Sequence, residues 1–76
     1  MTTDDSILFR SGDPNFMTSL ARGLEVLQAF SGQTRTLKMA AISEVTGLSR
    51  AVVRRCLYTL SEMGYVRQST DGYQIE

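Results

Sequence analysis

The sequence lacks histidine and tryptophan, and it has one proline and one cysteine among its 76 residues. Without histidine there is no imidazole general base and no histidine metal ligand. The single Cys56 cannot form an internal disulfide, and it has no second cysteine or histidine with which to bind zinc. There is also no phosphate-binding glycine loop and no base to activate a serine. We therefore expect no enzyme activity, no cofactor and no metal in this chain.

Long apolar runs are missing as well. None approaches the ~20 residues that span a bilayer, and the first six residues lack the basic start and apolar stretch of a secretory signal. Seventy-six residues, 42% of them apolar, allow one small domain with a modest core. We expect a cytoplasmic, single-domain chain without a membrane partner, and its small core favours association with a second subunit.

Net charge is absent too, because eight basic side chains balance eight acidic ones. A neutral chain argues against a nucleic-acid partner, which usually requires a basic surface. The charges are unevenly placed, however. Residues 33–55 hold five basic side chains and one acidic, a local charge of +4, and the rest of the chain carries −4. Residues 33–55 are therefore the segment in which we expect an anion-binding surface.

The chain divides into a tail and a domain. Residues 1–13 hold three acidic side chains and show no sustained hydrophobic period, so we expect a flexible N-terminal tail. Residues 14–76 form the domain. Apolar side chains at helical spacing predict a helix from about Met17 to Phe30. The stripe expected to be buried on it is Phe16, Leu20, Leu24, Leu27 and Phe30.

A shorter helix is expected from Met39 to Thr46, after a very short strand at Leu37–Lys38. It should bury Ile42 and Val45 and end at Gly47. A third helix should begin at Arg50, after an N-cap at Ser49, and stop at Gly64. The residues expected on its buried side are Val53, Cys56, Leu57, Leu60 and Met63.

The remainder of the chain alternates with the period of strands. Residues 65–69 and 73–75 are separated by Asp71-Gly72, a strong hairpin signal. Between the second and third helices, Ser43 is small where two helices cross, and Gly47 permits a positive φ. The prediction is a mainly α winged helix-turn-helix, with three helices and a two-stranded wing.

The outward face of the third helix carries the functional prediction. In such folds the first turns of this helix lie in the major groove of DNA, where arginine pairs with guanine and small apolar side chains meet the thymine methyl. The residues expected to contact DNA from this helix are Ser49, Arg50, Ala51, Val52, Arg54, Arg55 and Tyr58. Arg35, Lys38 and Arg67 are expected at the DNA backbone or minor groove.

Two simpler alternatives remain open. An arginine-rich helix face is often only solvated surface, and a winged-helix domain can serve protein–protein contact or dimerisation without binding DNA, its arginines then meeting an acidic partner. Cys56 lies on the buried stripe of the third helix, so we expect an inert core thiol.

Several segments together resemble one family. Residues 19–27, 42–49, 53–60 and 64–66 are similar to the N-terminal winged helix-turn-helix of IclR-type bacterial transcription regulators. Residues 12–23 resemble the subgroup that governs aromatic-acid catabolism and responds to p-hydroxybenzoate, protocatechuate or β-ketoadipate. The resemblance places the family's DNA-contacting arginine on Arg55, a second contact position on Val52, and the first helix's arginine on Arg22. Arg22 is therefore expected at the DNA backbone or minor groove. Many members have a hydroxyl at the position of Val52, and this chain has none.

The resemblance also implies partners. Family members bind palindromic operators in double-stranded DNA as homodimers or tetramers. They carry a larger C-terminal domain that binds the effector, an aromatic acid in this subgroup, so the chain is expected to be a DNA-binding fragment without that domain. Whether such a protein activates or represses transcription depends on where its operator lies.

Overall fold

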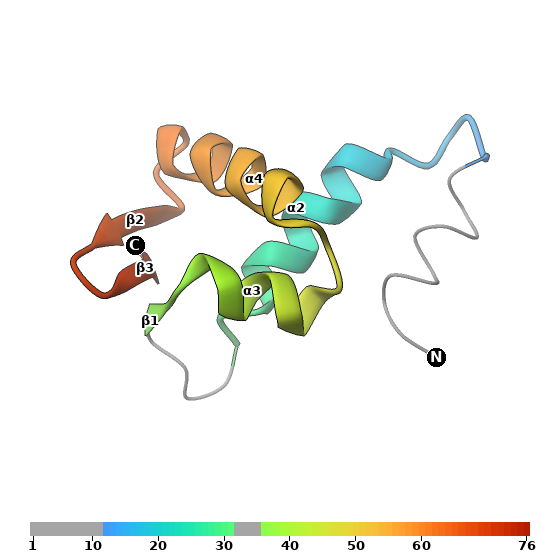
Figure 1. Ribbon diagram of the computed structural model, residues 1–76. Helices are drawn as coiled ribbons and strands as arrows, with labels where there is room; N and C mark the ends of the chain where they lie inside the picture. Colours follow the sequence, from blue (N-terminus) through green and yellow to red (C-terminus); the bar gives the residue numbers. More distant parts are fainter. Residues whose placement is uncertain (1–11, 32–35) are drawn as a thin grey trace.

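The computed structural model describes residues 12–31 and 36–76. Most of the expected tail at 1–13 lies outside these residues, and so does Arg35. Within them the chain forms helices α2 (Thr18–Gln28), α3 (Met39–Thr46) and α4 (Arg50–Glu62) and strands β1 (Thr36–Leu37), β2 (Val66–Ser69) and β3 (Gly72–Ile75) (Figure 1). This is the predicted winged helix-turn-helix.

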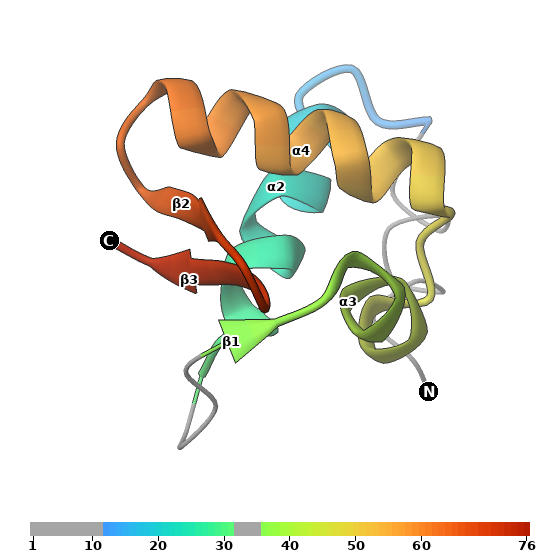
Figure 2. The ribbon, with the colours of Figure 1, turned by 60° about the vertical axis from the view of Figure 1, so that its left-hand side comes forward.

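The three helices enclose a single apolar core. α2 and α3 both pack against α4, and the hairpin packs beside the C-terminal half of α4 (Figure 2). Ile42 of α3 and Val53 and Leu57 of α4 are completely buried there. The full set of buried apolar residues is Val26, Phe30, Ile42, Leu48, Val53, Leu57, Leu60 and Val66. The core therefore fixes the outward face of α4 by holding its opposite face.

The sheet has one strand more than the two-stranded wing expected from the sequence. β3 lies in the middle of an antiparallel sheet of order β1-β3-β2. β1 pairs with β3 through Thr36–Gln74 and Leu37–Tyr73, and so links the wing to the start of α3. The connection between β2 and β3 is Thr70–Asp71, and Gly72 already belongs to β3.

The expected buried stripe of α2 is wrong in part. Leu20 is 55% exposed and Leu24 is 50% exposed, whereas Val26 is completely buried. At 3.6 residues per turn, Leu20 and Leu24 lie on the side of the helix away from Val26. The side of α2 that faces α4 carries Arg22 rather than an apolar side chain at its N-terminal end, near Cys56 of α4. Leu20 and Leu24 do follow helical spacing, but they form a second apolar face of α2 that is exposed.

Two further burial predictions are wrong. Val45 is 68% exposed, because the buried face of α3 is formed by Ile42 and, one turn later, Thr46. Met63 is 62% exposed, because α4 ends at Glu62 and the chain turns away at Gly64, which has a φ of 85°.

Hydrogen bonds from two side chains close the turn between α3 and α4. The Ser43 hydroxyl donates to the carbonyl of Leu48 at 2.6 Å. The Thr46 hydroxyl donates to the carbonyl of Ile42 at 2.7 Å and accepts from the buried backbone N–H of Leu48 at 3.2 Å. Gly47 takes the positive φ, 77°, that the turn requires. Ser43 is therefore more than a small residue at a helix crossing, because its hydroxyl holds the turn that orients α4.

Replacing Thr46 with valine tests this arrangement. Valine keeps the shape of the side chain but leaves the buried N–H of Leu48 without its acceptor, and an unsatisfied buried donor costs about 1–3 kcal/mol. For a domain of this size, thermal unfolding should move down by roughly 5–20 °C. Thr59→Val is the matched control, because the exposed Thr59 hydroxyl makes a similar bond to the carbonyl of Arg55. An equal shift in both variants would show that the buried turn has no special role.

Candidate DNA-binding surface

The start of α4 is fixed by its N-cap. The Ser49 hydroxyl accepts a hydrogen bond from the backbone N–H of Val52 at 3.2 Å, as the capping pattern predicts. This interaction satisfies one of the free amides of the first turn. The remaining backbone N–H groups there and the exposed Ser49 itself are placed for contact with an anion such as a phosphate.

The outward side of α4 is a continuous row of exposed residues. Arg54, Arg55 and Tyr58 follow Ala51 at intervals of three, four and seven positions, the spacing of one helical face, and Arg50 precedes them. The buried residues of the helix lie on the opposite side. In the part of the chain that the structure describes, the guanidinium groups of Arg50, Arg54 and Arg55 make no hydrogen bond or ion pair. Their donors are therefore available to a ligand.

Val52 differs from these neighbours. It is half-buried and packs against the core cluster, so it offers only part of its side chain to a groove. Its side chain also has no hydrogen-bonding group. Any contact from this position is an apolar one, for example with a thymine methyl.

Two hollows connect the row on α4 to the other candidate residues. One, of about 580 Å³, lies among Arg50, the start of α3 and the end of β1, with Lys38 at its wall. The other, of about 450 Å³, lies between α4 and the wing and is lined by Arg54, Tyr58 and Arg67 among others. The structure thus brings Lys38 to the same hollow as Arg50, and Arg67 to the same hollow as Arg54 and Tyr58.

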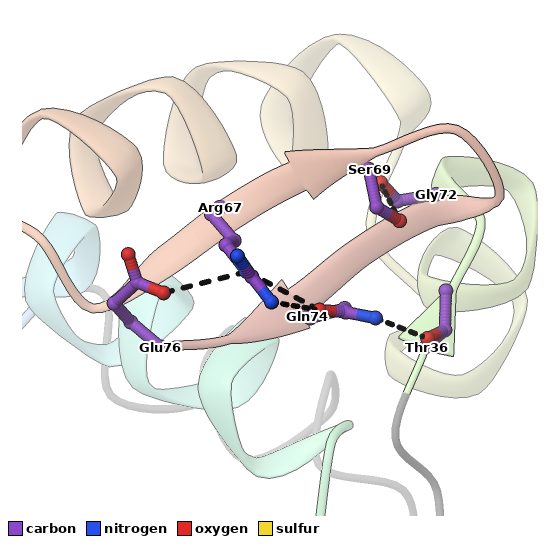
Figure 3. A network of polar contacts seen from close by, with 6 residues as sticks. All are labelled: Thr36, Arg67, Ser69, Gly72, Gln74 and Glu76. Carbon is purple, nitrogen blue, oxygen red and sulfur yellow. Dashed lines mark hydrogen bonds and ion pairs between the residues drawn. The ribbon is translucent and has the colours of Figure 1, made fainter.

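Arg67 is held in a network of polar contacts across the sheet (Figure 3). Its Nη2 and Nε donate to Oε1 of Gln74 at 3.0 and 3.3 Å, and its Nε lies 3.4 Å from Oε1 of Glu76. Gln74 in turn donates from Nε2 to the hydroxyl of Thr36 at 3.1 Å. Neither Gln74 nor Glu76 was predicted from the sequence as a functional residue. The alternation of the hairpin was the available signal, since it places residues 67, 74 and 76 on the same face of paired strands.

Arg22 lies between α2 and α4 rather than on the exposed row. It is half-buried, its Nε is buried without a hydrogen-bond partner among the described residues, and it lies close to Cys56. Any reach toward DNA must therefore come from the terminal nitrogens of its guanidinium group.

Burial raises the pKa of the Cys56 thiol above its ordinary value of 9.0, and the positive charges of Arg22 and Arg55 act in the opposite direction. As the pH rises, the Cys56 thiol therefore loses its proton in the unfolded chain before it does so in the folded chain. The stabilisation by the protonated thiol is complete below the ordinary pKa and is lost as the pH rises through the pKa of the folded state. We expect the difference in unfolding free energy between the wild-type chain and Cys56→Ala to be constant at neutral pH and to shrink above about pH 9. Urea unfolding of both chains across this range measures it. A constant difference up to pH 10.5 would contradict the shift.

Comparison with known proteins agrees with this geometry. Residues 19–70 match the IclR helix-turn-helix domain. The Pca regulon regulatory protein of Pseudomonas putida is 52% identical over 65 residues, which are 86% of this chain and 22% of that protein. The p-hydroxybenzoate hydroxylase transcriptional activator of Acinetobacter baylyi is 38% identical over 52 residues, 68% of this chain and 19% of that protein. The crystal structure of an IclR family transcriptional regulator from Brucella abortus superposes with a TM-score of 0.82 at 40% identity, covering 88% of this chain and 26% of that one.

The fold defines a winged helix-turn-helix domain, and the matched proteins are named as transcription regulators. The chain belongs to the IclR family. The family resemblance and the resemblance to the aromatic-acid subgroup are both confirmed by these relatives. The chain spans about a fifth of the length of the curated relatives that it matches.

Residues 12–31 and 36–76 also bear on a membrane or metal partner. None of the helices there is long and apolar enough to cross a membrane. No three histidine, cysteine or acidic side chains gather there as ligands for a metal ion.

Proposed function

We propose that the chain binds a specific sequence in double-stranded DNA. Arg50, Val52, Arg54 and Arg55 meet base edges in the major groove, and Arg22, Lys38, Ser49 and Arg67 contact phosphates or the minor groove. Ala51 and Tyr58 complete the surface. Arg35, also predicted from the sequence to contact DNA, lies outside the described residues. The observation that carries the proposal is the row of exposed arginines on α4, which have no hydrogen-bond or ion-pair partner among the described residues and lie opposite the helix face that packs into the core.

Gel shifts at several salt concentrations test this function. Binding to an operator, selected from a random duplex library with the wild-type chain, should weaken steeply as salt rises, because each phosphate contact releases counterions. Unrelated duplex should bind more weakly at every salt concentration. Absence of duplex binding even at low salt would overturn the proposal. It would favour the alternative of a protein-interaction domain.

We also propose that two copies of the chain act together on a palindromic operator, as a homodimer that can associate further into a tetramer. Support comes from the exposed apolar face of α2, where Met17, Leu20 and Leu24 are at least half exposed on one side of the helix. A palindromic operator requires the two copies to present one α4 helix to each half-site. Leu24→Glu should lower the dimer fraction in sedimentation velocity and weaken binding to a double half-site more than to a single one. Equal losses on both sites would contradict the pairing.

The regulated genes are proposed from the relatives' names. A target among genes of aromatic-acid catabolism, in a bacterial cytoplasm, fits the Pca regulon and p-hydroxybenzoate relatives. The test of this target is to measure how tightly the wild-type chain binds promoter fragments of catabolic genes that neighbour its own gene. Promoters of unrelated pathways are the control. Equal affinity for both sets would remove the support.

A further inference from the structure

Arg67 stands apart from the arginines of α4 because its charge is already compensated. Among the described residues, Arg67 forms an ion pair with Glu76, in which Nε of Arg67 lies 3.4 Å from Oε1 of Glu76. Arg50, Arg54 and Arg55 have no such partner among these residues. A phosphate approaching the wing thus meets a guanidinium that a carboxylate already engages.

The arrangement is built into the sheet. Thr36, Gln74 and Arg67 lie side by side across β1, β3 and β2, and the bond from Gln74 Nε2 to Thr36 leaves Gln74 Oε1 turned toward Arg67 (Figure 3). That oxygen accepts two N–H groups of the guanidinium and fixes its plane. Glu76 follows two residues after Gln74 on the same face of the strand. Its backbone N–H donates to the carbonyl of Tyr65 at 3.0 Å, which holds its position.

The pair is also easy to break. The side chains of Arg67 and Glu76 remain 63% and 51% exposed, so water screens their attraction. A backbone phosphate offers Arg67 a charge-assisted contact of the same kind as the carboxylate does. Exchange of Glu76 for a phosphate therefore requires only a rotation of exposed side chains, while Gln74 can keep the guanidinium in place.

We propose that Glu76 attenuates the affinity of the wing for DNA by competing with a backbone phosphate for Arg67. The inference rests on the proposed function, and it adds a residue that sets the strength of binding. The free protein holds Arg67 neutralised, and binding exchanges one anion for another. Removing the carboxylate leaves Arg67 ready for the phosphate and makes its full contribution available.

The test is a double-mutant cycle on the 76-residue chain, with Glu76→Gln, Arg67→Gln and the double variant. The probe is a labelled duplex of random sequence, measured by fluorescence anisotropy from low to physiological salt. Glu76→Gln should bind about two- to fivefold more tightly at low salt, the scale of an exposed ion pair. The slope of log K against log salt should steepen by up to about 0.9, one phosphate contact. In the Arg67→Gln background, Glu76→Gln should change affinity by less than half as much.

Glu62→Gln is the matched control, because Glu62 lines the same hollow and carries the same charge but makes no ion pair with Arg67 among the described residues. It should have a smaller effect, equal in the presence and absence of Arg67. The inference is overturned if Glu76→Gln raises the affinity for DNA no more than Glu62→Gln does, or if it raises the affinity equally in the Arg67→Gln background. Either result leaves the proposed function standing. If the wild-type chain binds no duplex at low salt, both are overturned. Circular dichroism melts confirm that each variant is folded.

Discussion

Replacing Arg55 with alanine should lower affinity for the selected operator roughly 10- to 100-fold, the loss expected for one bidentate arginine–guanine contact. Arg55 is exposed in the second turn of α4, on the face opposite the buried Val53 and Leu57. Affinity for duplex of unrelated sequence should fall only severalfold, because there the side chain contributes one positive charge. Anisotropy titrations on both duplexes at the same salt concentration give the two ratios.

Arg55→Lys separates base reading from charge. Lysine keeps the positive charge but lacks the planar fork that pairs with two acceptors of one base. We expect this variant to lose most of the operator preference while its affinity for unrelated duplex and its salt slope stay close to wild type. Equal losses on operator and unrelated DNA for Arg55→Ala, repaired by lysine, would instead assign Arg55 to a phosphate.

Replacing Gly72 with alanine should destabilise the domain by about 3 kcal/mol or more and lower its melting temperature by roughly 10–25 °C. Gly72 has a φ of 140°, which other residues rarely adopt. An added Cβ would also lie 2.8 Å from the carbonyl carbon of Leu37 and closer still to its oxygen. Both are backbone atoms of β1, so relief requires β1 and β3 to separate. Thermal denaturation followed by circular dichroism measures the shift.

Gly23→Ala is the control for this prediction. Gly23 lies in the interior of α2, and a Cβ there would meet nothing within 4 Å. The same chemical change should therefore raise stability by up to about 1 kcal/mol, since alanine favours the helix. A Gly72→Ala chain that melts within 2 °C of wild type would show that β1 does not lie as close to β3 as described.

The parts of the fold that the sequence predicted well are set by neighbouring residues. α3 spans Met39–Thr46 as expected and ends at Gly47, because glycine adopts the positive φ of the turn. α4 begins at Arg50 because the Ser49 side chain caps it. Such signals act within one or two turns of chain, so they can be recognised without knowing what packs against the helix.

The errors arose where burial depends on distant elements. Leu20 and Leu24 have the spacing of a buried stripe, yet α4 packs on another side of α2. The spacing shows that α2 has an apolar face but not which element covers it. The exposed side of α4 was predicted more securely, because its buried residues Val53, Leu57 and Leu60 were all expected on the core side and the exposed side follows from them.

Local sequence signals set the order of the elements, the end of α3 and the start of α4, and the basic charge of residues 33–55 can be counted within a neutral total. Which side of α2 is free and which side chains surround Arg67 depend on the packing of the folded chain. The reason is distance along the chain. Thr36 and Gln74 are 38 residues apart, and the pairing of β1 with β3 brings them together, fixes Gln74 against Arg67 and places Glu76 beside it. The charges can be counted in the sequence, but which charges pair depends on the residues that the fold brings close together.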